Sequence, residues 1–373
     1  MSIATLFKSP LLSGVGLMLG AGLVIASVAS QSPVDALREA DTRPALEAAH
    51  ASHAAMLAVA QAGQRLVSVG EHGLILFSED QGQTWQQAKV PVSVTLTAVS
   101  FANALQGWAA GHYGLILHTE DGGQSWTVQM DGQRAANLVL KEAEVRAEGT
   151  DDRQLKRALF SAKRLVADGP DKPFLDIHFR NAREGLAVGA YGLILATVDG
   201  GNRWMPLNYN MANSGERHLY SIAEANGYLY IAGEEGLLFR SQPGNDWHFD
   251  RLKTPYDGSF FTLSAAGEQL VAAGLKGNAF RSLDGGDSWQ TLDLPSDASV
   301  VDSILGANGD LLLVNQAGQL LQGNVATAAV RVLPSQPVAA PTAVLRTGQN
   351  SLLLSGLRGL AQVLVPSVQV LSN

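Results

Sequence analysis

The residue types that could support catalysis lie at turns between short apolar runs. Glu71, Glu234 and Glu235 each lie between the glycines of a Gly-x-x-Gly turn, and they could share one face of the folded chain. A glycosidase needs two carboxylates that face each other across a cleft. Carboxylates in exposed turns are usually only solvated, so we predict no catalytic residues and no enzyme activity.

A sialidase would also need three arginines that bind the carboxylate of its substrate. Phe239-Arg240-Ser241 and Phe280-Arg281-Ser282 only superficially resemble the Phe/Tyr-Arg-Ile/Leu-Pro phrase that supplies the first of them. We expect these arginines to line the surface of a strand. A carbohydrate-active protein, either a hydrolase or a glycan-binding module, remains the alternative function.

The histidines offer little support for a metal site. His50 and His53 are three residues apart without a carboxylate at suitable spacing, and the chain contains no cysteine. We therefore predict neither metal nor cofactor. His72 and His112 are expected at equivalent positions of two adjacent repeats, with Tyr191 at that position in the third. Such a column of imidazole and aromatic side chains would suit contact with a partner.

These turns belong to a repeat that dominates the chain. Gly-x-x-Gly turns, or Asn-x-x-Gly in one copy, begin at residues 70, 111, 189, 233, 274, 315 and 356, mostly 41 residues apart. Each copy holds four runs of four to six residues rich in Val, Ile, Leu and aromatics, which is typical of short strands in a meander. Four strands in about 41 residues is the length of one β-propeller blade. We predict an all-β, seven-bladed propeller of four-stranded blades over residues 56–373.

A second motif, Ser/Thr-x-Asp-x-Gly-x-x-Trp, follows the third strand of several repeats. We expect the Asp carboxylate to accept N–H groups one or two residues on, the glycine to adopt a positive φ, and the tryptophan to fill the gap between blades. The fourth copy keeps the tryptophan without the Asp. We assign a structural role to the motif residues Asp80, Gly82, Trp85, Asp121, Gly123, Trp126, Asp199, Gly201, Trp204, Trp247, Asp284, Gly286 and Trp289.

The motif is the Asp box of sialidases, sortilin-type receptors and several glycoside hydrolases. The longer phrase, for example Ala110-Gly111-His-Tyr-Gly114 through Trp126, resembles the photosystem II assembly and stability factor family. The resemblance covers residues 56–373 and is most specific in the first five repeats. It implies a non-catalytic propeller that contacts membrane subunits through a basic patch, for which the candidates are Arg180, Arg183, Arg240 and Arg281. Related propellers also occur in bacteria that do not photosynthesise.

One gap between repeats holds an insertion at residues 131–172. Its two segments, 135–147 and 152–167, have helical composition. In the second, Leu155, Leu159, Ala162 and Val166 form an apolar stripe. This pattern predicts a helical hairpin packed on the propeller. Its basic residues are either simply solvated or a docking surface for an acidic protein or anionic lipid headgroups, and they are Arg153, Lys156, Arg157, Lys163 and Arg164.

The N-terminal region is expected to direct export. Residues 11–29 are almost entirely apolar, so residues 1–30 form either a cleaved signal or an uncleaved membrane anchor. Both alternatives place the remainder outside the cytoplasm: in the periplasm, on an inner membrane facing the periplasm, or in a thylakoid lumen if the host is photosynthetic. We interpret residues 31–55 as a tether.

Together these features predict an exported scaffold. The net charge of −8 disfavours nucleic acid as a partner, because phosphates require a basic surface. We expect the partner to be a membrane protein or membrane-embedded complex, held by loops on a rigid ring during its assembly or operation.

Overall fold

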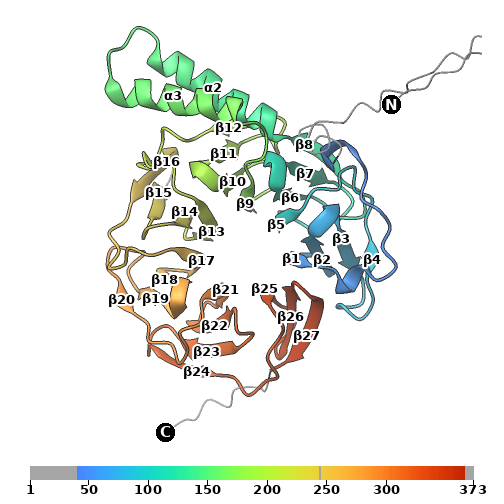
Figure 1. Cartoon of the computed structure of the whole chain (residues 1–373). Helices are drawn as coiled ribbons and strands as arrows, with labels where there is room; N and C mark the ends of the chain where they lie inside the picture. Colours follow the sequence, from blue (N-terminus) through green and yellow to red (C-terminus); the bar gives the residue numbers. More distant parts are fainter. Residues whose placement is uncertain (1–39, 243–244, 366–373) are drawn as a thin grey trace, which may run out of the picture.

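The chain folds as a ring of seven antiparallel sheets, which confirms the predicted seven-bladed propeller. The computed structural model describes residues 40–242 and 245–365, so the predicted signal or anchor lies outside the described residues. Figure 1 shows the sheets arranged around a central axis, with the first strand of each sheet nearest that axis. No described helix is long and apolar enough to cross a bilayer.

The strands of each blade are paired in sequence order. Blades 1 to 3 contain β1 (Met56–Ala62), β2 (Arg65–Gly70), β3 (Ile75–Ser78) and β4 (Gln86–Gln87); β5 (Leu96–Phe101), β6 (Gly107–Gly111), β7 (Ile116–Thr119) and β8 (Thr127–Met130); and β9 (Phe174–Phe179), β10 (Gly185–Gly189), β11 (Ile194–Thr197) and β12 (Met205–Pro206). Blades 4 and 5 contain β13 (Leu219–Ala225), β14 (Tyr228–Gly233), β15 (Leu238–Gln242) and β16 (Asn245–Arg251); and β17 (Phe260–Ala266), β18 (Gln269–Gly274), β19 (Ala279–Ser282) and β20 (Gln290–Thr291). Blades 6 and 7 contain β21 (Val300–Leu305), β22 (Asp310–Asn315), β23 (Leu320–Asn324) and β24 (Ala329–Val332); and β25 (Pro341–Arg346), β26 (Ser351–Gly356) and β27 (Gly359–Leu364).

Alternate connections of an antiparallel meander lie at opposite ends of the sheet, and this gives the ring two distinct faces. One face carries the Asp boxes and the turns between first and second strands, and we call it the box face. The other carries the Gly-x-x-Gly turns and the connections between blades, and we call it the tip face. In the described part of the chain, four of the Gly-x-x-Gly turns are single 3₁₀ turns: η2 (Glu71–Gly73), η3 (His112–Gly114), η4 (Ala190–Gly192) and η5 (Leu275–Gly277). A further 3₁₀ turn, η1 (Ala51–His53), precedes the first blade.

The hydrophobic core is divided among the interfaces between blades. In the described part of the chain, buried apolar side chains form seven clusters, one for each pair of neighbouring blades. The box tryptophans enter these clusters. Trp126 of blade 2 packs against blade 1 and is only 4% exposed, and Trp204 of blade 3 packs against blade 2. Burial of this kind makes each indole a wedge between two sheets.

Each box is a hydrogen-bonded turn, but its pattern differs from the predicted one. The carboxylate of Asp80 accepts the backbone N–H and the hydroxyl of Thr84, four residues on, at 2.8 and 2.6 Å. The hydroxyl of Ser78 instead accepts the N–H of Gly82 at 2.7 Å. The indole Nε1 of Trp85 donates to the carbonyl of Gly82 at 3.1 Å. The expectation of N–H groups one or two residues from the Asp was therefore wrong, because the turn encloses a longer loop.

The N-terminal segment closes the ring. In blade 1, the second glycine of the Gly-x-x-Gly turn packs directly on the connection to the next blade: a Cβ on Gly73 would overlap the carbonyl oxygen of Val92. A Cβ on Gly359 of blade 7 would overlap the carbonyl oxygen of Ser52 in the same way. Residues before β1 thus take the place of the seventh connection between blades. The hydroxyl of Thr342 completes the closure by donating to the carbonyl of Met56 at 2.8 Å.

The described part of the segment predicted as a tether packs on blade 1. The N–H of Ala45 donates to the carbonyl of Val90 at 3.1 Å, and the N–H of Ser93 donates to the carbonyl of Ala40 at 2.8 Å. The side chains of Ala40 and Ala45 also pack against the cluster between blades 1 and 2. Residues 40–55 are therefore fixed to the tip face and the edge of the first blade.

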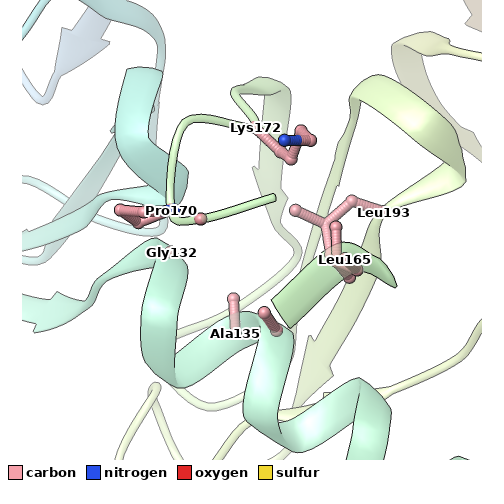
Figure 2. Close-up of a pocket in the computed structure, with 8 residues that line it drawn as sticks. Gly132, Ala135, Leu165, Pro170, Lys172 and Leu193 are labelled. Carbon is pink, nitrogen blue, oxygen red and sulfur yellow. The ribbon is translucent and has the colours of Figure 1, made fainter. Parts of the chain in front are cut away.

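The insertion forms the predicted helical hairpin. Its helices are α2 (Gly132–Ala147) and α3 (Arg153–Ala167), capped by the carboxylates of Asp131 and Asp152. They project beyond the rim of the ring in Figure 1. Figure 2 shows the base of the hairpin, where Ala135 of α2 and Leu165 of α3 meet Leu193 of blade 3 around a small hollow. This apolar contact attaches the hairpin to the propeller.

Candidate functional site

The tips of the Gly-x-x-Gly turns repeat one backbone conformation with different side chains. The second residue between the glycines has a left-handed backbone in five blades, although none of these residues is glycine: His72 (φ 53°), Tyr113 (57°), Tyr191 (57°), Glu235 (51°) and Lys276 (55°). A residue with a Cβ in this conformation costs about 1–2 kcal/mol. Such strain often accompanies functional positions. The tip face therefore displays side chains where glycine would be more stable.

This geometry corrects the predicted histidine column. His72 is equivalent to Tyr113 and Tyr191, whereas His112 is the first residue of its turn and is equivalent to Glu71. The two histidines therefore do not occupy the same position. Both are exposed on the tip face. Burial of the His112 ring nevertheless lowers its pKa below the usual value for histidine.

Aromatic side chains gather on the tip face at blades 3 to 5. Tyr191 is 49% exposed, and its ring meets the ring of His218 edge-on, with 5.0 Å between centroids. Tyr220 contacts His218 on one side and Phe261 on the other, the latter at 5.4 Å. The ammonium of Lys172 lies 5.6 Å from the centre of the Tyr191 ring. We call Lys172, Tyr191, His218, Tyr220 and Phe261 the aromatic patch.

The glutamates considered for glycosidase chemistry each have a structural partner. Glu71 accepts the N–H of Ala55 at 3.0 Å. Glu234 accepts the N–H of His218 at 2.8 Å and the hydroxyl of Tyr220 at 3.2 Å. Burial together with the Glu234 carboxylate raises the pKa of Tyr220 to about 12.

The third of these glutamates, Glu235, forms an ion pair with Arg217. All three carboxylates thus hold segments of the tip face in place. Among the described residues, no three His, Asp or Glu side chains are grouped to hold a metal ion.

The predicted partner-binding arginines lie toward the box face and have different surroundings. Arg240 donates to the carbonyl of Gly285 and to the carboxylate of Asp287, both at 2.9 Å, and so joins blade 4 to blade 5. Arg281 donates to the carbonyls of Val325 and Ala326 and so joins blade 5 to blade 6. These contacts between blades are structural. The sequence had indicated only that both residues line a strand.

The two remaining arginines belong to blade 3. Arg180 lies near Glu224, with 3.7 Å between its Nε and a carboxylate oxygen, and over the ring of Trp247. Arg183 is exposed in the turn between β9 and β10. As partner contacts, all four arginines remain predictions.

The outer face of α3 carries all five basic residues predicted for the insertion, and all five are exposed: Arg153, Lys156, Arg157, Lys163 and Arg164. Two of them form ion pairs, Lys156 with Asp151 at 2.6 Å and Arg164 with Glu216 at 2.8 Å. Phe160 lies on the same face and is 69% exposed. Phe160 was not among the predicted residues, although its position three or four residues from four of these cations places it on their face of the helix.

Two partly buried carboxylates of the inner strands were also missed. Asp176 of β9 accepts the N–H of Ile222 in blade 4 at 2.7 Å, and Asp302 of β21 accepts the N–H of Val344 in blade 7 at 2.8 Å. Burial raises the pKa of each carboxyl to about 6. They join neighbouring blades around the axis.

Comparison with known proteins identifies the family. The model of the family described as photosynthesis system II assembly factor YCF48 matches residues 45–141 and 160–323, which is more than half of the chain. The chain belongs to this family. The resemblance noted in the sequence is thereby confirmed. The gap in the match, residues 142–159, falls within the helical insertion.

A curated relative and several solved structures are similar to this family member. The photosystem II assembly lipoprotein Ycf48 of Synechococcus sp. (strain CC9902) is 28% identical over 146 residues, 39% of this chain and 44% of that protein. The match thus spans less than half the length of this relative.

The structure of YCF48 bound to a D1 peptide is 16% identical, with a TM-score of 0.60 over 84% of this chain and 94% of that one. YCF48 from Cyanidioschyzon merolae is 13% identical, with a TM-score of 0.58 over 87% and 99%. The WD40 propeller domain of Doa1 is 10% identical, with a TM-score of 0.61 over 86% and 95%. At these identities the likeness to solved structures establishes the fold alone.

Proposed function

We propose that this chain is an exported, non-catalytic scaffold that holds an extramembrane segment of a membrane protein against its tip face while a complex is assembled. Family membership supports the assembly role: the curated relative is a photosystem II assembly lipoprotein, and a solved relative is bound to a D1 peptide. The client of this chain is a membrane protein or membrane-embedded complex. Its place is the periplasm or the periplasmic side of an inner membrane, or the thylakoid lumen in a photosynthetic host.

The observation that carries the choice of face is the set of strained, non-glycine tips. Five tips keep side chains in a conformation that glycine adopts at lower cost. The aromatic patch adds half-exposed Tyr191 and the rings beside it, and aromatic side chains are enriched at protein interfaces. Because the ring is closed, these groups are held in place before binding, which lowers the ordering cost of association.

The carbohydrate-active alternative is not favoured. The family is one of assembly factors. The glutamates on the tip face are engaged with Ala55, His218, Tyr220 and Arg217, and Arg240 and Arg281 are engaged with neighbouring blades. Hydrolysis of a sialoside or polysaccharide by the purified chain would reverse this choice.

Photo-crosslinking from matched positions on the two faces tests the proposal. A benzophenone amino acid replaces Tyr191 on the tip face or, as the control, Leu283 in a box turn; the two side chains are 49% and 42% exposed. We expect crosslinks to membrane proteins from position 191 and few from position 283, in membranes of cells that express the full chain. Equal crosslinking from both positions, or none from 191, would refute the assigned face.

A further inference from the structure

The outer face of α3 combines positive charge with one exposed aromatic ring. At 3.6 residues per turn, the five basic residues and Phe160 fall within about 120° of the helix circumference. Phe160 lies near the middle of this arc, with cations on both sides. We call these six residues the α3 outer face.

The opposite side of α3 packs on α2 and on the cluster between blades 2 and 3, and Arg164 at the edge of the outer face pairs with Glu216 of the propeller, so the rest of the outer face points away from these contacts. Ala162 is buried, and Leu159 and Leu165 pack against the cluster between blades 2 and 3. The side chain of Asp152 caps the helix by accepting the N–H of Gln154 at 2.7 Å. Phe160 is therefore exposed because it lies on the outward side of a well-formed helix, and not because the end of the helix is frayed.

The charge of this face is largely unneutralised. Within the described residues, Arg153, Arg157 and Lys163 take part in no salt bridge, while Lys156 and Arg164 pair with Asp151 and Glu216. The whole chain has a net charge of −8, so this face is locally positive on a protein that is negatively charged overall. Its complement is an anionic surface.

The exposed phenyl ring distinguishes a membrane from an acidic protein surface. Lys and Arg side chains reach lipid phosphates, and each contributes roughly a fivefold gain in affinity near an anionic bilayer. An apolar ring between them can enter the boundary between headgroups and acyl chains, as in helices that lie on a membrane. An acidic protein would need a pocket for the ring placed among its carboxylates.

The position of the hairpin agrees with a membrane on the tip side. It replaces the connection between blades 2 and 3, and such connections lie on the tip face. Ala40, the first described residue, is hydrogen-bonded to Ser93 in the neighbouring connection. The apolar stretch at residues 11–29 ends about ten residues earlier, a length of chain that spans at most roughly 35 Å.

We propose that the α3 outer face lies on an anionic lipid bilayer, with the five cations at the phosphates and Phe160 in the interface. This contact orients the ring toward the membrane that holds the client. This proposal extends the proposed function and rests on it for the location of the chain in the cell. The contact itself requires only the chain and the lipid.

A fluorescent probe on the cysteine-free chain tests this contact. Phe160→Cys or, as the control, Val145→Cys on α2 provides a single labelling site, and Val145 is 63% exposed. Each full-length variant carries an environment-sensitive dye and is mixed with vesicles of phosphatidylcholine, with or without phosphatidylglycerol. We expect a blue shift from position 160 only with phosphatidylglycerol, and little shift from position 145.

Replacing all five basic residues of the face with Gln should weaken the response at position 160 by more than about tenfold. Crosslinking of the client from position 191 by the same Gln variant is measured separately, so failure of the lipid contact and failure of the scaffold role are distinguishable. The proposal is overturned if position 160 does not shift on anionic vesicles, or shifts equally on neutral ones. It is also overturned if soluble polyglutamate produces the same shift, which would indicate an acidic protein partner.

Discussion

The box face and the tip face are built from the same repeat, yet they use the left-handed backbone conformation differently. In the boxes of blades 2, 3 and 5 it is adopted by glycines, such as Gly122 and Gly123. In the tips it is adopted by the second glycine and also by the residue before it, as in His72, Tyr191 and Lys276; on the box face Gln81 of blade 1 is one of the non-glycine exceptions. Glycine lowers the strain of a turn, whereas a side chain at the same φ adds strain but presents a chemical group. The comparison suggests that one face maintains the ring and the other makes contacts.

The largest expected effect is a loss of folding stability when a box side chain, but not a tip side chain, is removed. Trp126→Ala should lower the free energy of unfolding by about 3–5 kcal/mol, because the buried indole leaves a cavity between blades 1 and 2. Urea unfolding followed by circular dichroism measures the change. Tyr191→Ala is the control and should cost well under half as much. Equal losses would show that the tips stabilise the ring as much as the boxes do.

The pH dependence of stability should distinguish the carboxylates of the box turns from those of the inner strands. Hydrogen bonds from Thr84 to Asp80, and from Ser288 to Asp284, lower the pKa of each box carboxyl to about 2. The stability that these groups add is present above pH 4 and is lost only as pH falls through their folded pKa. The boxes should therefore contribute no slope between pH 5 and 7.

Asp176 and Asp302 should behave in the opposite way. Their pKa is raised by burial to about 6, so the folded state holds more protons than the unfolded state between about pH 4 and 6. The stability linked to their protonation is present below pH 4 and is lost as pH rises through 6. The melting temperature should therefore decrease from pH 5 to pH 7, and Asp302→Asn should reduce that slope. An unchanged slope would contradict the assignment.

The smallest expected effect concerns the strain at a tip. Lys276→Gly should leave stability unchanged or raise it by up to about 1 kcal/mol, because glycine adopts the left-handed conformation without a Cβ penalty. Lys253→Gly, in the connection between blades 4 and 5, provides a comparison at a residue without positive φ. Thermal unfolding of both variants measures the difference. A clear loss of stability in Lys276→Gly would show that this side chain serves the fold.

The sequence predicted the parts of the molecule that repeat. The period of 41 residues gave the blades, and the box phrase gave the turns before Trp85, Trp126, Trp204 and Trp289. A local pattern suffices there because each blade contacts mainly its neighbours. The apolar stripe of 152–167 likewise predicted α3 and its buried side, which packs on α2 and the cluster between blades 2 and 3.

Contacts between blades were not predictable from the repeat. Arg240 and Arg281 donate to carbonyls of the next blade, and Asp176 accepts an N–H across an interface. No local pattern specifies such partners, which lie more than 40 residues away along the chain. The histidine assignment failed for a simpler reason: one residue of register within a four-residue turn separates His72 from His112.

The use of Ser52 as the seventh connection has a consequence for biogenesis. Ser52, which packs against Gly359, is made before all seven blades, whereas β27, the strand that contains Gly359, is made after the first six. Among the described residues, the cluster at this seam, around Met56, Leu74 and Leu76, is also the smallest of the seven. A chain emerging in order can form its early sheets but stays an open arc until blade 7 has been made. Loss of residues 50–55 should leave a molecule with intact sheets and an unsealed seam, which would expose strand edges to other chains.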